Sequence, residues 1–284
     1  MQIDHARIAG HWIRYGVRKG DSARAPLLIF NGLGANIELA LPFIDALPGP
    51  SIVIFDVPGV GGSPAPPSPY RPASVARLAA ALLDHLGYGQ TDVLGVSWGG
   101  AIAQQFAFQH RSRCRRLVLA ATAPGALMVP GHPSVLLKML TPRRYVDKRH
   151  AQRIAGDVYG GAFRREPDLV ERTMHHIRFS SRTGYYMQLG AAFGWTSLPW
   201  LFTLRQPTLI IAGDDDPLVP TINARIMQWL IPGARLEIVH CGHLFLITLP
   251  AQSARIVDAF LTEPDERSRR ENRPSQSRSF GGIQ

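Results

Sequence analysis

Short runs of hydrophobic residues recur along the chain, separated by segments with helical spacing. Each run is almost continuously apolar, which is typical of strands in a parallel sheet that is covered on both faces. These runs occupy residues 27–31, 52–56, 92–95, 117–121, 208–212 and 236–239. Helical patterns are found at residues 72–86, 99–108, 223–230 and 252–261. The alternation predicts an α/β fold with right-handed crossovers, and residues 6–17 are expected to form an antiparallel hairpin at one edge of the sheet.

The alternation stops between residues 124 and 204. That segment has a helical and irregular pattern and is rich in Arg, Tyr, Trp and Met. Ligands of open α/β sheets bind at the carboxyl ends of the strands, so an insertion here is expected to form a lid over that edge. We therefore expect an α/β core at 1–123 and 205–262 and a lid at 124–204. The polar residues 263–284 have no periodicity and are expected to be a disordered tail.

Composition narrows the class of protein. No run approaches the roughly 20 apolar residues that a transmembrane helix needs. The amino terminus lacks the charged-then-apolar layout of a signal sequence, so we expect a cytoplasmic protein. The net charge is +10, and residues 138–205 alone hold 12 basic and 5 acidic side chains. No nucleic-acid-binding motif accompanies them, so solvated surface arginine is the favoured interpretation, with docking onto an anionic assembly as the alternative.

The segment Gly95-Val96-Ser97-Trp98-Gly99 has the spacing G-x-S-x-G, between a predicted strand and a predicted helix. A serine held at such a strained turn needs neighbours without bulk, because the chain passes close to itself there. The turn would lift Ser97 out of the sheet and aim a helix N-terminus at developing negative charge. The alternative is a glycine-rich turn with an ordinary surface serine. The rest of the chain decides between the two.

A serine hydroxyl becomes a good nucleophile only when a base takes its proton and a third group orients that base. Three aspartates follow the run at 208–212, namely Asp214, Asp215 and Asp216. Asp216 is our candidate, because Pro217 fixes the turn after it, while the other two are expected to cap the loop in contact with solvent. A metal site at these carboxylates is disfavoured, since no histidine or second carboxylate cluster accompanies them.

The base is expected in the loop after the last strand, where the chain reads Val239-His240-Cys241-Gly242-His243. The two histidines beside a cysteine allow a triad base, a Cys–His pair or metal ligands. His243 is our candidate base, and His240, which closes the strand, is expected to be structural. Cys241 does not lie in a strand-to-helix turn like that predicted at Ser97, so it is disfavoured as a nucleophile. The chain order Ser97, Asp216, His243 is that of the α/β-hydrolases, so we predict a catalytic triad of these residues.

An oxyanion hole needs two backbone N–H groups near the nucleophile. We expect one from Trp98, which follows the serine, and the other from Leu33 in the turn formed by residues 31–34. A dinucleotide-binding interpretation of that turn fails, because position 37 is Ile and not Gly. The glycine-rich residues 56–63 are interpreted as a structural tight turn below the pocket.

Together these segments resemble the α/β-hydrolase superfamily and, more narrowly, the intracellular medium-chain-length polyhydroxyalkanoate depolymerases. The resemblance rests on residues 27–32, 55–62, 95–100, 212–217 and 242–248 in the core, and on 142–146, 159–161 and 194–197 in the insertion. Asn31 stands where the family usually has histidine, so a side-chain role of that histidine is not carried over. The backbone donor at Leu33 should be preserved.

The resemblance implies a serine hydrolase that cleaves the esters of stored polyester and releases 3-hydroxy fatty acids through an acyl-enzyme on Ser97. It implies no cofactor, no metal and no nucleic-acid partner. The implied partners are the polyester granule surface and granule-associated proteins, with the enzyme cytoplasmic on storage granules. An insoluble polyester also calls for an apolar cleft, and the residues available to line one are Tyr185, Tyr186, Met187, Phe193, Trp195 and Trp200. The alternative for each of them is a place in the core of the lid itself.

Two alternatives remain open at this point. A soluble carboxylesterase, lactonase or C–C hydrolase would share the fold and the triad, because neither determines the substrate. A non-catalytic granule-surface protein would keep the fold without needing a complete triad, and here all three members are present.

Overall fold

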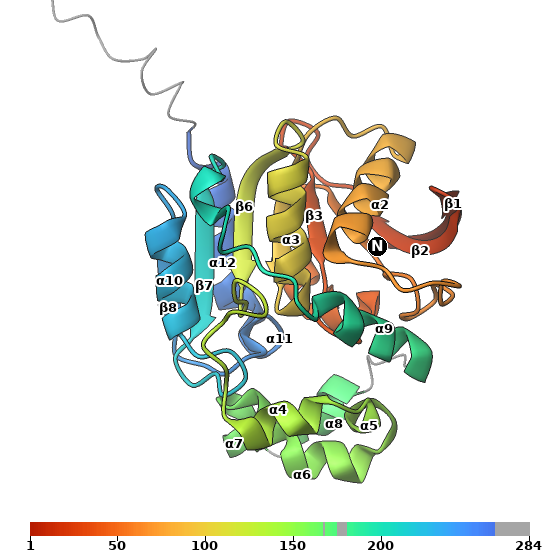
Figure 1. The fold of residues 1–284 in the computed structure, drawn as a ribbon. Coiled ribbons are helices and arrows are strands. Elements are labelled where there is room, and N and C mark those ends of the chain that lie inside the picture. Colours follow the sequence, from red (N-terminus) through yellow and green to blue (C-terminus); the bar gives the residue numbers. More distant parts are fainter. Residues whose placement is uncertain (167, 175–180, 265–284) are drawn as a thin grey trace, which may run out of the picture.

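A computed structural model describes residues 1–166, 168–174 and 181–264 and places eight strands in one sheet (Figure 1). The strand order is β1-β2-β4-β3-β5-β6-β7-β8. In chain order the strands are β1 (Gln2–Ile8), β2 (His11–Arg18), β3 (Leu27–Phe30), β4 (Ile52–Phe55), β5 (Thr91–Val96), β6 (Cys114–Ala120), β7 (Thr208–Gly213) and β8 (Arg235–Val239). The first two strands form the expected antiparallel hairpin, and β3 to β8 run parallel. The predicted mostly parallel α/β-hydrolase fold is confirmed.

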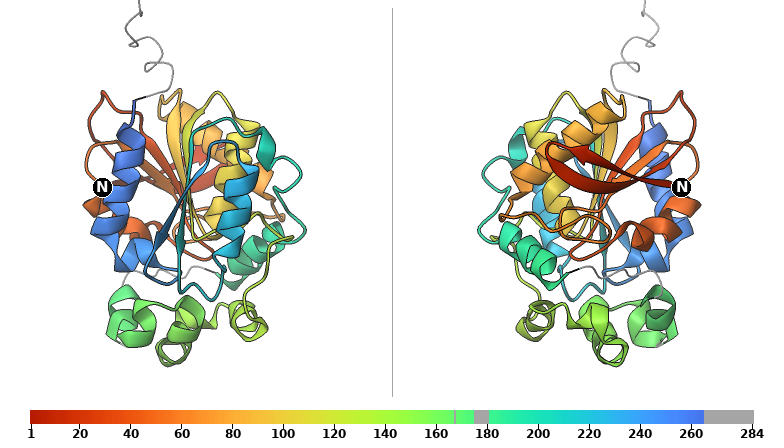
Figure 2. Two further views of the ribbon diagram at one scale, coloured as in Figure 1. Left: turned by 90° about the vertical axis from the view of Figure 1, so that its left-hand side faces the viewer. Right: turned by 90° about the vertical axis from the view of Figure 1, so that its right-hand side faces the viewer.

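Helices cover both faces of the sheet, which explains why the strands are apolar throughout (Figure 2). One face packs against α2 (Pro72–His85), α3 (Trp98–Gln109) and α10 (Ile222–Leu230). The other packs against α1 (Leu41–Ala46), α11 (Phe245–Thr248) and α12 (Pro250–Thr262), with the short 3-10 helix η1 (Ile37–Ala40) beside them. Successive residues of β3 point to opposite faces, and all four are buried.

The alternation of strands and helices is interrupted between β6 and β7, where a helical insertion (residues 124–204) replaces a single crossover helix. Its helices α4 to α8 lie beyond the end of the sheet toward which β7 points (Figure 1). The insertion contains α4 (Pro133–Met139), α5 (Arg143–Val146), α6 (Lys148–Tyr159), α7 (Ala162–Arg165), α8 (Asp168–Met174), α9 (Arg182–Ala192) and the 3-10 helix η2 (Leu201–Thr203). The insertion therefore stands where the loops at the carboxyl ends of the strands converge.

Helix α6 illustrates how the local sequence builds this insertion. Its N-cap is Asp147, whose carboxylate accepts the backbone N–H of His150 at 2.9 Å, and its C-cap is Gly160, with a φ of 62°. Its buried positions recur three or four residues apart (Ala151, Ile154, Ala155 and Val158), so one apolar face packs inward.

The predicted carboxy-terminal tail and the predicted lack of a transmembrane helix can be compared with the described residues. The tail expected at 263–284 lies outside the described residues except for Glu263 and Pro264. Within the described ranges, none of the helices combines the length and the apolar character needed to cross a membrane.

Candidate active site

Ser97 occupies a strained turn between β5 and α3. Its φ of 53° and ψ of −118° lie in a region that residues other than glycine rarely adopt. Gly95 and Gly99 permit the turn, because a Cβ at Gly99 would overlap the carbonyl oxygen of Phe30 and one at Gly95 would lie 2.5 Å from the Ala103 Cβ. The small residues of the motif therefore let the strand and helix close tightly under the serine.

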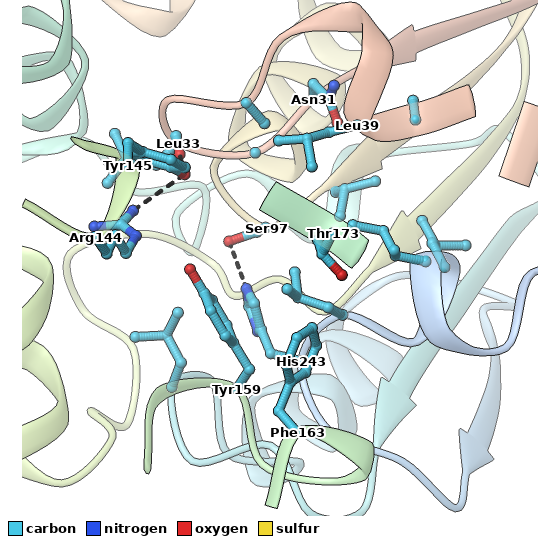
Figure 3. A pocket seen from close by; sticks show the side chains of 18 of the residues that line it. Asn31, Leu33, Leu39, Ser97, Arg144, Tyr145, Tyr159, Phe163, Thr173 and His243 are labelled. Carbon is cyan, nitrogen blue, oxygen red and sulfur yellow. Dashed lines mark hydrogen bonds between the residues drawn. The ribbon is translucent and has the colours of Figure 1, made fainter. Parts of the chain in front are cut away.

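Hydrogen bonds from β6 hold the turn in place. The Ser97 N–H donates to the Ala120 carbonyl at 2.9 Å, and the Thr122 hydroxyl donates to the Ser97 carbonyl at 2.7 Å. The strained backbone is thus fixed by the neighbouring strand and the segment that follows it, while the side chain of Ser97 faces the pocket (Figure 3).

The structure brings the three predicted triad residues into one hydrogen-bonded chain. The Ser97 hydroxyl lies 2.9 Å from His243 Nε2 (Figure 3). On its other side, His243 Nδ1 lies 2.7 Å from Asp216 Oδ2. His243 and Asp216 are 3% and 8% exposed, so their interaction is shielded from water. This arrangement suits a general base that takes a proton from a serine.

Backbone donors and acceptors orient the acid and the base. The second carboxylate oxygen of Asp216 accepts the N–H groups of Leu218 and Val219, both at 2.9 Å. The N–H of His243 donates to the Tyr159 carbonyl at 2.7 Å, so the helical insertion fixes the loop that carries the base. A Cβ at Gly242 would overlap that same carbonyl, which explains the glycine before His243.

The acidic, histidine and cysteine residues next to the predicted acid and base in the sequence do not take part in this chain of hydrogen bonds. Asp214 pairs with the exposed His240 at 2.6 Å, and Asp215 accepts the Gly161 N–H at 2.7 Å and pairs with Arg164. Cys241 is buried, with its sulfur 3.2 Å from the Thr248 hydroxyl. These residues stabilise the loops around the site. In the described part of the chain no group of three or more His, Cys, Asp or Glu side chains is arranged to hold a metal ion.

The two predicted oxyanion donors flank the nucleophile. Trp98 is the first residue of α3, so its N–H has no partner within the helix. The other turn passes beside the serine, since a Cβ at Gly32 would lie 3.7 Å from the Ser97 Cβ. No acceptor for the N–H of Leu33 is found among the described residues. In place of the usual histidine, Asn31 donates its side-chain amide to the Asn36 carbonyl at 2.7 Å and closes the turn.

The helical insertion bonds to both segments that carry the predicted oxyanion donors, which sequence patterns did not indicate. The side-chain carbonyl of Gln188 in α9 accepts the Gly34 N–H at 2.7 Å, and its backbone carbonyl accepts the Trp98 indole N–H at 2.9 Å. The Tyr145 hydroxyl donates to the Leu33 carbonyl. No motif marks Gln188 or Tyr145, because their partners lie far away in the sequence.

The pocket above Ser97 is predominantly apolar. The helical insertion, η1 and the loops after β7 and β8 supply its aliphatic and aromatic walls, with Leu39, Met139, Ala151, Ile154, Phe163, Val170, Leu218 and Leu244 among them. The side chains of Asn31, Arg144, Tyr145, Tyr159 and Thr173 add polar groups (Figure 3). A mostly apolar cavity with a few convergent polar groups is the usual form of a small-molecule site.

The expected lining set was wrong. None of Tyr185, Tyr186, Met187, Phe193, Trp195 and Trp200 belongs to the pocket around Ser97. Trp200 stacks on Phe108 of α3 with ring centres 4.5 Å apart, and Trp195 donates to the Gln105 side chain at 2.9 Å. Phe193 is 82% exposed. The two tryptophans attach the end of the insertion to α3. The part of the insertion that lines the pocket lies between Met139 and Thr173.

Residues 56–63 form the structural turn that the sequence indicated. The carboxylate of Asp56 is buried, accepts the N–H groups of Ile37 and Gly62 at 2.9 and 2.8 Å, and pairs with Arg14 at 2.9 Å. Arg14 also pairs with Glu38. This buried ion pair joins β2, η1 and the turn below the pocket.

Comparisons with known proteins agree with the geometry. A family model described as the alpha/beta hydrolase fold matches residues 25–250. The chain is 54% identical over 264 residues to a poly(3-hydroxyalkanoate) depolymerase of Ectopseudomonas oleovorans, covering 93% of each chain. It is 27% identical to 3-oxoadipate enol-lactonase 2 of Acinetobacter baylyi, covering 85% of this chain and 90% of the relative.

Solved structures show the same fold. An enol-lactonase from Burkholderia xenovorans superposes with a TM-score of 0.77 at 24% identity, covering 92% of this chain and all of the other. A meta-cleavage product hydrolase from Pseudomonas fluorescens gives a TM-score of 0.79 at 21% identity, covering 92% and 98% of the two chains.

Proposed function

Because this chain belongs to the α/β-hydrolase family and is a poly(3-hydroxyalkanoate) depolymerase by its similarity to that enzyme, we propose that it cleaves medium-chain-length polyester through a serine acyl-enzyme. The observation that carries the substrate is the 54% identity over 93% of both chains. The continuous hydrogen bonding from Ser97 through His243 to Asp216 supports the mechanism.

The first half of the reaction uses the triad to attack the ester. His243 takes the proton of the Ser97 hydroxyl as the oxygen adds to the ester carbonyl, and Asp216 stabilises the imidazolium that forms. The N–H groups of Leu33 and Trp98 donate to the oxyanion of the tetrahedral intermediate. His243 then protonates the departing alkoxide, and the acyl group remains on Ser97.

The second half releases the acyl group with the same residues. Water gives its proton to His243 and attacks the acyl-enzyme carbonyl, and the free acid leaves as the Ser97 oxygen takes the proton back. These steps balance with one water molecule consumed for each ester, and they require no cofactor.

The helical insertion serves as the lid of this site. Together with the core, its residues supply the apolar wall around Ser97, which favours the aliphatic side chains of a medium-chain polyester. The Tyr159–His243 and Tyr145–Leu33 hydrogen bonds connect the lid directly to the base and to the oxyanion turn. Closure of the lid would therefore exclude water and complete the catalytic geometry together.

Association with storage granules accounts for the apolar surface of the lid. Large hydrophobic side chains that face solvent there include Leu137, Leu140 and Val146, which are 65%, 53% and 53% exposed. The same segment carries the excess of basic residues. An apolar and cationic surface suits attachment to a polyester particle with an anionic coat. The proposed location is the cytoplasmic granule surface, with the polyester and granule-associated proteins as partners.

The test is release of 3-hydroxy acids from purified medium-chain polyester granules. Wild type should release them and Ser97→Ala should not. Ser112→Ala removes an exposed hydroxyl that is not part of the pocket, and it should behave as wild type. Short-chain polyester and p-nitrophenyl octanoate are measured in parallel. Hydrolysis of the soluble ester alone would overturn the polyester assignment in favour of a soluble carboxylesterase, lactonase or C–C hydrolase.

A further inference from the structure

A buried arginine of the lid lines the same pocket as the catalytic serine. Arg144 in α5 is only 3% exposed, and its guanidinium lies across the cavity from Ser97, with the Tyr159 hydroxyl directed toward the space between them (Figure 3). Arginine is rarely buried to this extent unless it has an ionic partner. The position of this charge therefore requires an explanation.

Among the described residues, the side chains that bond or stack with Arg144 are uncharged. One terminal nitrogen donates to the Tyr185 hydroxyl at 2.6 Å, the other donates to the Tyr145 hydroxyl at 3.3 Å, and the guanidinium lies 4.4 Å from the centre of the Tyr145 ring. Its Nε atom is buried without an acceptor. Within the described residues no Asp or Glu pairs with it.

Arg14 provides the contrast within the same protein. It is 7% exposed, and it has two carboxylate partners, Glu38 and Asp56. A buried guanidinium with matched carboxylates is the arrangement that repays its desolvation. Arg144 is at least as buried, no described carboxylate pairs with it, and unlike Arg14 it lines the pocket around Ser97.

The charge of Arg144 is not neutralised by its tyrosine neighbours. Loss of hydration raises the pKa of Tyr159 to about 12 and the pKa of Tyr185 to about 12, so both phenols stay protonated at neutral pH. Burial alone lowers the pKa of Arg144, but its phenolic neighbours outweigh that effect and hold the pKa above the ordinary value. The pocket therefore contains a full positive charge beside a mostly apolar wall.

We propose that Arg144 binds the free carboxylate at the end of the polyester chain and so makes the enzyme cleave the terminal ester. The proposal rests on the function proposed above, whose substrate has one carboxylate end per chain. Guanidinium and carboxylate pair through two parallel hydrogen bonds, and burial strengthens that pairing. In the terminal unit the carboxylate is separated from the scissile ester oxygen by only two carbon atoms, so one pocket can hold both groups.

This binding mode assigns the products of each step. Ser97 attacks the carbonyl of the last ester, the C–O bond to the terminal unit breaks, and His243 protonates the departing alkoxide. One free 3-hydroxy acid leaves with its carboxylate on Arg144, and the rest of the chain stays on Ser97. Hydrolysis of that acyl-enzyme by water then creates a new carboxylate end for the next cycle.

A pair of matched substrates tests the assignment. One is the dimer of 3-hydroxyoctanoate with a free carboxylate, and the other is the methyl ester of the same dimer. For wild type we expect kcat/KM for the free acid to exceed that for the methyl ester by about 10- to 100-fold, as is usual for a lost charged hydrogen-bonded pair. In Arg144→Gln this ratio should fall toward one.

Two further variants separate binding from folding. Arg143→Gln removes a charge from the same helix, but Arg143 is exposed and pairs with Asp147, so the substrate ratio should stay at the wild-type value. Arg144→Lys keeps a charge without the planar pair of donors and should retain part of the preference. Free 3-hydroxyoctanoate should inhibit wild type more strongly than Arg144→Gln, which measures binding independently of turnover.

The outcomes distinguish the two proposals. If wild type hydrolyses both dimers at equal kcat/KM, the role of Arg144 is wrong while polyester hydrolysis stands. Equal losses on both substrates in Arg144→Gln would mean that the residue only supports the lid. If wild type cleaves neither dimer but releases 3-hydroxy acids from granules, the Arg144 assignment is wrong and polyester hydrolysis stands. If it acts on neither the dimers nor the granules but cleaves p-nitrophenyl octanoate, the proposed function itself is overturned.

Discussion

The side-chain carbonyl of Gln188 accepts the backbone N–H of Gly34 at 2.7 Å, joining α9 of the helical insertion to the turn that carries one proposed oxyanion donor. Gln188 is 1% exposed, and its own backbone carbonyl accepts the indole N–H of Trp98, the residue that carries the other donor. A single residue of the insertion therefore contacts both halves of the proposed oxyanion hole. Donor position matters there, because the hydrogen bonds act only on the charge that develops in the transition state.

Gln188→Met should lower kcat on p-nitrophenyl octanoate by about 10-fold or more with a small change in KM, since loss of one oxyanion donor outright costs about 100- to 1,000-fold. The substitution keeps the size of the side chain and removes the acceptor for Gly34. Steady-state kinetics measure the effect.

Gln105→Met is the matched control. Gln105 also bonds the insertion to the core, through the Trp195 indole at 2.9 Å, but that contact lies away from the pocket. Its kinetics should resemble those of wild type. Equal losses in the two variants would show that attachment of the insertion, and not the geometry of the oxyanion turn, controls the rate.

Asp216→Asn should reduce kcat by about 1,000- to 10,000-fold, because the neutral amide no longer stabilises the imidazolium and favours the wrong tautomer of His243. Asp214→Asn changes the neighbouring carboxylate, which pairs with exposed His240, and should retain nearly full activity. Initial rates on p-nitrophenyl octanoate compare the two. A large loss in the Asp214 variant would contradict the assignment of the acid.

The double variant Leu137→Ser/Leu140→Ser should weaken association with polyester granules, because it removes two exposed apolar side chains from the lid surface. Co-sedimentation with purified granules gives the bound fraction, and turnover of p-nitrophenyl octanoate gives the integrity of the site. We expect the bound fraction to fall several-fold more than turnover does. Replacing exposed Trp229 on α10 by Ser controls for surface hydrophobicity in general.

Stability should depend on pH through Asp92 at the start of β5. Burial raises the pKa of Asp92 to about 6, although Arg115 pairs with it at 2.6 Å. The folded protein then holds this proton more tightly than the unfolded chain, whose aspartate pKa is about 3.9. The contribution of Asp92 to the free energy of unfolding is therefore greatest below about pH 4, and it is lost as the pH rises through about 6. Its size is on the order of 2 to 3 kcal/mol.

In Asp92→Asn the side chain at position 92 is uncharged at every pH, so comparison with wild type isolates the effect of this carboxyl group on stability. Urea unfolding of both proteins between pH 4 and 7 should show wild type losing stability relative to the variant as the pH rises. A difference that stays constant across this range would rule out a raised carboxyl pKa at this position.

The sequence by itself determined the order of the elements and the identity of the triad candidates. Continuous apolar runs indicate strands buried on both faces, and this local pattern located all the parallel strands. Gly95 and Gly99 indicated the tight turn at Ser97, since only small residues fit where the strand, the turn and the helix lie so close together. Such features depend on residues near one another in the sequence, where composition and spacing carry the physical constraint.

Tertiary structure alone decided what lines the pocket and which residues bond to the proposed oxyanion turn. The aromatic residues near the end of the insertion were expected over Ser97, yet Trp195 and Trp200 pack on α3, because apolar composition does not specify which surface a side chain covers. The contacts of Gln188 with Gly34 and Trp98 span 154 and 90 positions of the chain. The isolation of Arg144 from every described carboxylate is likewise a property of packing, since its near neighbours in sequence include Asp147. These relationships arise only when the lid folds over the sheet, because distance in space, and not spacing along the chain, determines which charges and hydrogen bonds meet.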